Sequence, residues 1–518
     1  MTRTEIEMKY LVHQGRNSRQ VQQKLARQFR QFGFTVNGMQ PLCFEDTYYD
    51  TSTHDLENAG WFLRIRNTAD SQTVTMKSAT QTDAAFTRTE IEHAYDKQDP
   101  RNPSEIFFSP DSDTSTLLHS LKTPPASLIP VYQQQTKRSR FKIRHPSNKR
   151  THIEWAIDTV SSHLLPDDYV EFEFELLKGQ ESLLQHINLI AQAQKHLKPS
   201  TMSKLQRGLY ASCPDRQPGL KQNQTTVHAQ RRWHTQATIT LQSCLDLLTK
   251  CEPFAFEAIH PEGVHQLRIA TRKIRAALNL FHEVIPPVSA GKLQSELRYL
   301  TRALGRVRDL DVHRAQLSAI LEKKKWRKYE KYLSRQQIRR QAQLERALTK
   351  HSASSRHQLE DIIQQIHCDE INSSRTVEQY LAQILPPTIN RILNAGANLG
   401  TQASVDEIHA FRIALKTLRY QLETFSDISN NLDQLTNTAK GLQSLLGDHQ
   451  DCQLARSMVE KFIATQAGKR FPGLDKFYQQ QDKQARKIRV KLEQKWPDFV
   501  QYCRPFQVSP QTATGFSQ

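Results

Sequence analysis

Charged residues alternate with apolar ones near the N-terminus, where Glu5, Glu7 and Lys9 lie two residues apart. In a β-strand these three side chains share one face and the intervening apolar side chains share the other. Two carboxylates and an ammonium are costly to bury unless they hold a metal ion or an anion. Taken alone, the pattern is more typical of an edge strand whose polar face contacts water.

The same period-two pattern recurs in four further segments, at Arg64/Arg66, Arg88/Glu90/Glu92, Arg138/Arg140 and Glu171/Glu173/Glu175. In an open sheet the charged faces would contact water, whereas in a barrel they point inward and helices cover the apolar outside. The mixture of signs favours the barrel, because rows of Glu bind divalent cations and rows of Arg and Lys bind phosphate oxygens. The alternative is a salt-bridge network of the same residue types inside a barrel.

The sequence changes character near residue 213. Before it, strand-like segments lie at 46–50, 61–66, 73–77, 87–93, 137–144, 151–158 and 169–177. Residues 213–226 are polar with Pro and Gly, and from 227 onward the pattern is helical with breaks at Pro286–Pro287 and Pro386–Pro387. We therefore expect an α+β protein with a β-rich domain over 1–212, a linker over 213–226, an all-α domain over 227–505 and a tail over 506–518.

The composition restricts location and partners. The sequence contains no run of about 18 apolar residues, so no membrane span is predicted. Glu5 and Glu7 stand where a signal peptide would have a basic start. Seven scattered cysteines without CxxC spacing indicate a reducing compartment, and we expect a cytoplasmic protein. Of the net charge of +18, residues 213–518 carry +16. This excess predicts a polyanionic partner, with a generally basic solvated surface as the alternative.

The helical half repeats itself. The segment 265–278 aligns with 409–422, and Leu304-Gly305…Asp309 aligns with Leu446-Gly447…Asp451. The interval from the histidine to the later glycine is 40 residues in the first copy and 38 in the second. Matched intervals predict a duplicated helical bundle, with repeats at about 227–370 and 371–505.

Basic residues in each repeat recur at offsets 0, 3, 7 and 10, which is one stripe of a helix whose opposite stripe is apolar. Two such helices would line one groove or pore with cations; the alternative is a solvated basic face. The stripes consist of His265, Arg268, Arg272 and Arg275, and of His409, Arg412, Lys416 and Arg419. Because Arg308 is replaced by Gln450 and Lys273 by Thr417 in the second copy, we expect the two sides to be unequal.

The first half contains a series of short motifs that together are typical of one protein family. In chain order they are Glu5-Ile-Glu7-Met-Lys9, Thr47-Tyr-Tyr-Asp50, Gly60-Trp-Phe-Leu-Arg64-Ile-Arg66, Thr75-Met-Lys77, Arg88-Thr-Glu90-Ile-Glu92, Lys137-Arg138-Ser-Arg140, Asp158, Glu171-Phe-Glu173-Phe-Glu175 and Ser203-Lys204. This series resembles the CYTH domains, also called triphosphate tunnel metalloenzymes. The resemblance implies an eight-stranded antiparallel tunnel that hydrolyses a triphosphate with Mg2+ or Mn2+.

Site roles follow from this resemblance and from the chemistry of the side chains. The expected metal ligands are Glu5, Glu7, Glu171 and Glu173. The expected phosphate-binding residues are Lys9, Arg64, Arg66, Lys77, Arg138, Arg140 and Lys204. Catalytic or metal support is expected from Arg88, Glu90, Glu92, Asp158 and Glu175. No His or Cys nucleophile is indicated, since phosphoryl transfer depends mainly on positioning and charge neutralisation.

Residues 227–505, with their two histidine-headed stripes, resemble the CHAD family, the conserved-histidine α-helical domains. Members of this family are associated with inorganic polyphosphate, so the resemblance implies phosphate contacts from both stripes, including His265 and His409. Metal binding by these histidines is disfavoured, because neither has a neighbouring ligand at metal spacing. The basic runs 323–328 and 335–340 are typical of a solvated helix face and keep nucleic acid as a weaker option.

Together these features predict a metal-dependent inorganic triphosphatase whose second domain binds inorganic polyphosphate, with association with polyphosphate granules. The alternative from another class is a non-catalytic polyphosphate-binding scaffold. Other substrates for the tunnel would be thiamine triphosphate, a nucleoside triphosphate or an RNA 5′-triphosphate end. Membrane or nucleic acid association is a third possibility.

Overall fold

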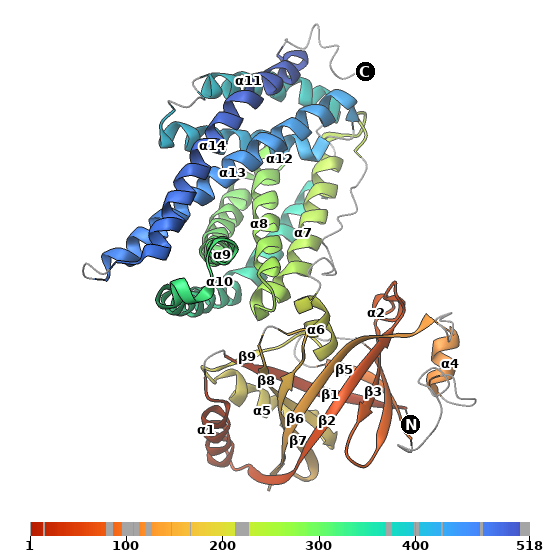
Figure 1. Cartoon of the computed structure of the whole chain (residues 1–518). Coiled ribbons are helices and arrows are strands. Elements are labelled where there is room, and N and C mark those ends of the chain that lie inside the picture. Colours follow the sequence, from red (N-terminus) through yellow and green to blue (C-terminus); the bar gives the residue numbers. More distant parts are fainter. Residues whose placement is uncertain are drawn as a thin grey trace. The chain divides into compact units, whose positions relative to one another are not determined.

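The computed structural model divides the chain into two compact units, Met1–Gln217 and Pro218–Gln518 (Figure 1). It describes residues 2–13, 16–78, 86–95, 107, 113–120, 127–146, 148–165, 167–212, 227–368, 375–397, 399, 403–425, 428–466 and 470–507. The expected linker and residues 508–518 of the expected tail lie outside these ranges.

The first unit is built on one antiparallel sheet that closes into a ring. The strands are β1 (Thr2–Val12), β2 (Thr35–Asp50), β3 (Trp61–Asn67), β4 (Gln72–Ser78), β5 (Phe86–Tyr95), β6 (Ile129–His145), β7 (Asn148–Ser161), β8 (Tyr169–Lys178) and the short β9 (Leu197–Pro199). They are ordered β5-β4-β3-β2-β6-β7-β8-β1-β9. Because β5 also pairs with β1, the eight strands β1 to β8 form a closed ring. The eight-stranded antiparallel tunnel is therefore confirmed.

Short helices accompany the ring, namely α1 (Ser18–Gln31), α2 (Asp55–Asn58), α4 (Asp113–Ser120), α5 (Glu181–Gln192) and α6 (Lys204–Ser212). Apolar residues of α1 and α5, such as Phe29 and Ile187, form one core with Trp155 and Phe174 from the outer face of β7 and β8. Leu118 of α4 joins a second core with residues from β3, β4 and β5. Because the strands alternate, burying the apolar side chains outside the ring turns the charged ones inward.

The second unit is all-helical, as the periodicity predicts. Its helices are α7 (Trp233–Glu257), α8 (Pro261–Leu280), α9 (Pro287–Ile320), α10 (Arg327–Cys368), α11 (Val377–Gly396), α12 (Val405–Phe425), α13 (Asn430–Ala464) and α14 (Pro472–Cys503), with short 3-10 helices at Lys323–Trp326 and Arg504–Phe506. Pro287 begins α9, but Pro386 and Pro387 lie inside α11, so the expected break there is wrong. In the described residues, no helix is long and apolar enough to cross a bilayer.

The duplication is visible in the arrangement of the helices. The two basic segments form α8 and α12, and the two Leu-Gly…Asp segments lie in α9 and α13. The starts of α7 and α11 are joined by backbone hydrogen bonds at an isolated Arg232–Thr376 bridge, and Trp233 stacks on Tyr380 with ring centroids 3.7 Å apart. The apolar stripes of α8 and α12 are buried in one common core.

Candidate functional sites

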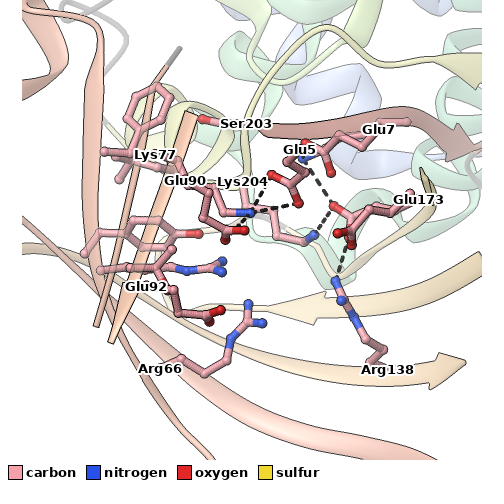
Figure 2. A pocket seen from close by; sticks show the side chains of 17 residues that line it. Glu5, Glu7, Arg66, Lys77, Glu90, Glu92, Arg138, Glu173, Ser203 and Lys204 are labelled. Carbon is pink, nitrogen blue, oxygen red and sulfur yellow. Dashed lines mark hydrogen bonds and ion pairs between the residues drawn. The ribbon is translucent and has the colours of Figure 1, made fainter. Parts of the chain in front are cut away.

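A polar cavity of about 140 Å³ lies inside the ring of the first unit (Figure 2). Its lining includes the charged residues Glu5, Glu7, Lys9, Arg64, Arg66, Lys77, Glu90, Glu92, Arg138, Glu173, Glu175 and Lys204. Three residues expected at the site, Arg140, Asp158 and Glu171, are not in this lining. The side chain of Arg88 lies outside the described residues, although its backbone pairs with Glu5 across β5 and β1.

One side of the cavity is held together by Lys77. Its ammonium lies 2.8 Å from Glu5 Oε2 and 2.9 Å from Glu90 Oε1. The strand register places these groups, since Lys77 on β4 lies opposite Glu90 on β5, which in turn pairs with β1. Burial acts to raise the pKa of Glu5, but Lys77 outweighs it and the pKa lies below its ordinary value.

The opposite side is centred on Glu173, which lies across from Lys9 in the register of β1 and β8. Lys9 Nζ is 3.2 Å from Glu173 Oε1 and 3.1 Å from Glu7 Oε1. Arg138 and Lys204 each donate to Glu173 at 2.6 Å. Burial acts to raise the pKa of Glu173, but the three surrounding cations hold it well below its usual range.

Lys204 projects from α6 and meets three carboxylates. Its ammonium lies 2.9 Å from Asp158, 3.0 Å from Glu171 and 2.6 Å from Glu173. The close approach of α6 to β6 depends on Gly208, where an added Cβ would lie 2.1 Å from the ring of Tyr132. A side chain at position 208 would therefore displace α6 and move Lys204.

Glu171 differs from the other expected metal ligands because it is fully buried outside the cavity lining. Among the described ion pairs, Lys204 is the cation nearest to it, with its ammonium 3.0 Å from one carboxylate oxygen. Burial raises the pKa of Glu171 to about 7, although Lys204 acts in the opposite direction.

Several arginines of the tunnel are fixed by carboxylates in two-point contacts. Arg138 donates to both oxygens of Asp158 at 2.7 Å, and Arg66 to both oxygens of Asp46 at 2.7 and 3.0 Å. Such paired contacts set the orientation of a guanidinium as well as its position. Asp46 was not expected from the sequence, although it lies two residues before the inward-facing Tyr48.

Arg140 makes the same kind of contact, donating to both oxygens of Glu154 at 3.0 and 2.8 Å. Because Arg140 does not line the cavity, the structure leaves it away from the other residues expected to contact phosphate. Glu154 is the second carboxylate that sequence reasoning missed. Its four-residue spacing from Asp158 on β7 was the available signal.

The cavity also bears on metal binding. Within the described residues, no group of three His, Cys, Asp or Glu side chains is already arranged around one point. The carboxylates that line the cavity are nevertheless suited to a hard divalent cation, because they offer oxygen ligands with no His or Cys among them. Glu5, Glu7 and Glu173 each contact a lysine ammonium, so the carboxylates in this part of the cavity already stabilise positive charge. The donor set therefore fits Mg2+ or Mn2+.

The second unit contains a cluster of cations, the cationic site, made by Arg268 and Arg272 of α8 with Arg412 and Lys416 of α12. As far as the chain is described, none of these side-chain heads makes an ion pair or a hydrogen bond. All four are only partly exposed. Burial, followed by the charges of the neighbouring arginines, lowers the pKa of Lys416 to about 6. Partly buried cations that repel one another are typical of a site that binds an anion.

The remaining residues of the two stripes have different surroundings. Arg419 contacts Glu423 at 3.0 Å and packs over the ring of Tyr420, which Arg272 also approaches from α8. Arg275 lies instead near Arg298 and Arg302 of α9, whose like charges, after burial, lower its pKa. The structure therefore does not bring Arg275 together with the cationic site.

The two histidines have unequal neighbours. His409 Nδ1 lies 3.3 Å from the side-chain oxygen of Gln450. His265 lies near Arg308, the counterpart of Gln450 in the first repeat; burial and then Arg308 lower the pKa of His265. The inequality expected from the two copies is present in these contacts.

Two family models match the chain. The CYTH domain model matches residues 3–209, and the CHAD domain model matches residues 239–460. The chain joins a CYTH domain to a CHAD domain. CYTH tunnel enzymes generally depend on a divalent metal.

Curated proteins and solved structures are also similar to parts of the chain. Two uncharacterized proteins of Mycobacterium tuberculosis are each 28% identical over 254 residues, which are 45% of this chain and 47% of theirs. The chain thus spans about half the length of these relatives. The CHAD domain of the plant Ricinus communis is 20% identical, with 54% of this chain and 95% of that chain covered and a TM-score of 0.46. HpAC1 from Hippeastrum, described as having a dominant triphosphatase activity, is 16% identical, with 39% and 93% covered and a TM-score of 0.30.

Proposed function

We propose that the CYTH domain hydrolyses inorganic triphosphate to diphosphate and phosphate with Mg2+ or Mn2+, and that the CHAD domain binds inorganic polyphosphate. The observation that carries the first part is the cavity itself, where lysines and arginines alternate with carboxylates and none of the described lining residues is His or Cys. The volume of about 140 Å³ suits a small linear substrate, because drug-sized ligands usually occupy about 300–1,000 Å³.

In this proposal the basic side chains of the tunnel bind the phosphate oxygens. Arg66 and Arg138 are oriented in advance by Asp46 and Asp158, so little reorganisation of these two side chains is needed when the substrate enters. Lys9 and Lys77 would move from their carboxylates to the phosphates. Water supplies the oxygen that the terminal phosphoryl group gains, and the bond to the diphosphate leaving group breaks.

The carboxylates released by those lysines would hold the cation. Glu5, Glu7 and Glu173 are the ligands that we propose, with Glu90 and Glu175 as neighbouring acidic groups on the cavity wall. The bound cation would neutralise phosphate charge and help to activate the attacking water. Glu171 would act from behind Lys204, because it does not line the cavity.

A purely anion-binding scaffold is the competing function for the tunnel. Among the described residues, six carboxylates line the cavity, at positions 5, 7, 90, 92, 173 and 175, and in an anion site they would only weaken binding. Their presence favours an enzyme that uses a metal ion. For the CHAD domain, the unpaired cations of α8 and α12 carry the proposal, because a flexible chain of phosphates can follow them.

The enzyme proposal is tested by supplying inorganic triphosphate, ATP and thiamine triphosphate with Mg2+ or Mn2+ and measuring phosphate release. We expect inorganic triphosphate to be preferred and Glu7→Gln to lower kcat/KM by roughly 100-fold or more. Glu45→Gln is the matched control, because Glu45 contacts Gln133 away from the cavity. Release of phosphate from none of the substrates, or an undiminished Glu7→Gln variant, would contradict the proposal.

The polyphosphate proposal is tested by measuring binding in EDTA, which prevents hydrolysis. Alanine replacement of Arg268, Arg272, Arg412 and Lys416 should abolish the binding that the CHAD domain contributes. A control variant with alanine at four exposed positions removes the same number of basic side chains elsewhere; its positions are Lys323, Lys324, Lys328 and Arg335. Equal losses in the two variants would show that net charge, and not the cationic site, attracts the polymer.

A further inference from the structure

Two aspartates occupy equivalent places in the two repeats of the CHAD domain. Asp309 lies on α9 and Asp451 on α13, each four residues after a glycine and therefore on the same helix face as that glycine. At Gly305 an added Cβ would lie 3.7 Å from Arg268 Nε. The side chain of Arg268 therefore lies against α9 one turn before Asp309, whereas, among the described residues, no neighbouring atom comes within 4 Å of an added Cβ at Gly447 in the second repeat.

The charged groups that act on these aspartates come from α8, α10 and α12 and from the helices α9 and α13 that carry the aspartates. Around Asp309 they are Arg268 of α8, Arg308 of α9 itself, Arg340 of α10 and Arg412 of α12. Around Asp451 they are Arg268, Arg412, Asp309 and Asp448. Burial raises the pKa of both aspartates despite the arginines. The partly buried carboxylate of Asp309 lies in a cationic environment, whereas that of Asp451 has two arginines and two aspartates around it.

These aspartates do not form salt bridges with the arginines. In the described parts of the chain, neither carboxylate has an ion pair within 4.0 Å or a hydrogen bond. The contrast with the tunnel is direct, since Asp158 there contacts Arg138 at 2.7 Å through both oxygens. A carboxylate that orients a guanidinium makes such contacts, whereas Asp309 and Asp451 act on the cationic site only through their charge.

We propose that Asp309 and Asp451 are internal counterions that restrain anion binding and set the affinity of the cationic site for polyphosphate. The inference rests on the proposed polyphosphate function. Without ligand, the two negative charges reduce the repulsion among Arg268, Arg412 and their neighbours. With ligand, the phosphates take over this role and are themselves repelled by the carboxylates. Neutralising the aspartates therefore strengthens binding, whereas removing residues that position the arginines would weaken it.

The deciding experiment measures the affinity of the full chain for inorganic polyphosphate of defined length, in EDTA at constant pH and salt. The Asp309→Asn, Asp451→Asn double variant should bind about tenfold more tightly than the wild type, and each single variant about threefold more tightly. Asp433→Asn is the matched control, because Asp433 is exposed at the start of α13 and its loss changes the net charge equally per residue. It should remain within about twofold of the wild type.

Affinity at fixed pH is more informative than a pH profile, because Lys416 and His265 also take up protons when an anion binds. Binding that is unchanged or weaker in the double variant and in both single variants overturns the inference while leaving polyphosphate binding intact. Absence of polyphosphate binding in both wild type and double variant overturns the proposed function and the inference together. The single variants keep the test decisive where the double variant does not fold.

Discussion

The two domains present cations to phosphates in opposite ways. In the tunnel, Arg138, Lys204 and Lys77 contact carboxylates at 2.6–2.9 Å, so these three positive charges have fixed positions. In the CHAD domain, Arg268 and Arg412 make no such contact within the described chain. A site that performs chemistry on a short substrate requires fixed geometry, whereas a site for a flexible polymer requires only a favourable field.

Substitution of Glu173 is expected to have the largest effect on stability, and it tests this difference between the two domains. Glu173→Ala leaves Lys9, Arg138 and Lys204 without their shared buried carboxylate, which should destabilise the CYTH domain by roughly 3–5 kcal/mol. Chemical denaturation of the full chain measures this loss as an earlier transition of that domain. Arg412→Ala in the cationic site should leave stability unchanged or raise it, because no ion pair is lost. A similar loss in both variants would remove the distinction between the two sites.

Much of the tunnel could be predicted because strand alternation is a local property. The spacing of Glu5, Glu7 and Lys9 already assigns them to one face, and burial of the apolar face outside the ring determines which side is inward. The partners of the arginines could not be predicted in the same way. Asp46 lies opposite Arg66 only through the register of β2 and β3, and register depends on the whole sheet.

The helical half shows a similar division between local and non-local information. The offsets of α8 predict its buried stripe, and Leu267 and Ile274 are indeed in the core. The offsets also place Arg275 beside Arg272, but the neighbour of each residue depends on how the helices cross. Arg275 faces α9 while Arg272 approaches Tyr420 of α12. Pro386 and Pro387 were expected to break a helix, yet packing of Leu385 and Ile389 in the core accompanies a continuous α11.

The second prediction concerns salt. If four unpaired cations of the CHAD domain bind phosphates, counterion release should give a slope of about −3 for log affinity against log salt concentration. Raising salt from 50 to 200 mM would then weaken polyphosphate binding by roughly 60-fold. The KM for triphosphate in the enclosed, ion-paired tunnel should change far less, because buried pairs are screened less. Equal salt slopes for the two ligands would indicate that the two sites bind phosphate by the same means.

The smallest expected effect is on the pH dependence of stability through Lys416. Its folded-state pKa of about 6 lies below the ordinary lysine value of about 10.5. Between these two values the unfolded chain holds more protons than the folded one, so Lys416 makes stability rise with pH across that interval. Lys416→Met removes this contribution, which would be roughly 5 kcal/mol at pH 7 for a fully buried lysine with these pKa values. Because Lys416 is partly exposed and screened by solvent, we expect a gain of about 1 kcal/mol for the CHAD domain at pH 7, with little difference between the proteins near pH 10. Thermal unfolding from pH 6 to 10 measures the stability of the wild type and of the Lys416→Met variant.

Lys328→Met is the control, because Lys328 is exposed, and it should leave the pH dependence of stability unchanged. An equal gain in stability from both substitutions would mean that the cationic site carries no special electrostatic strain.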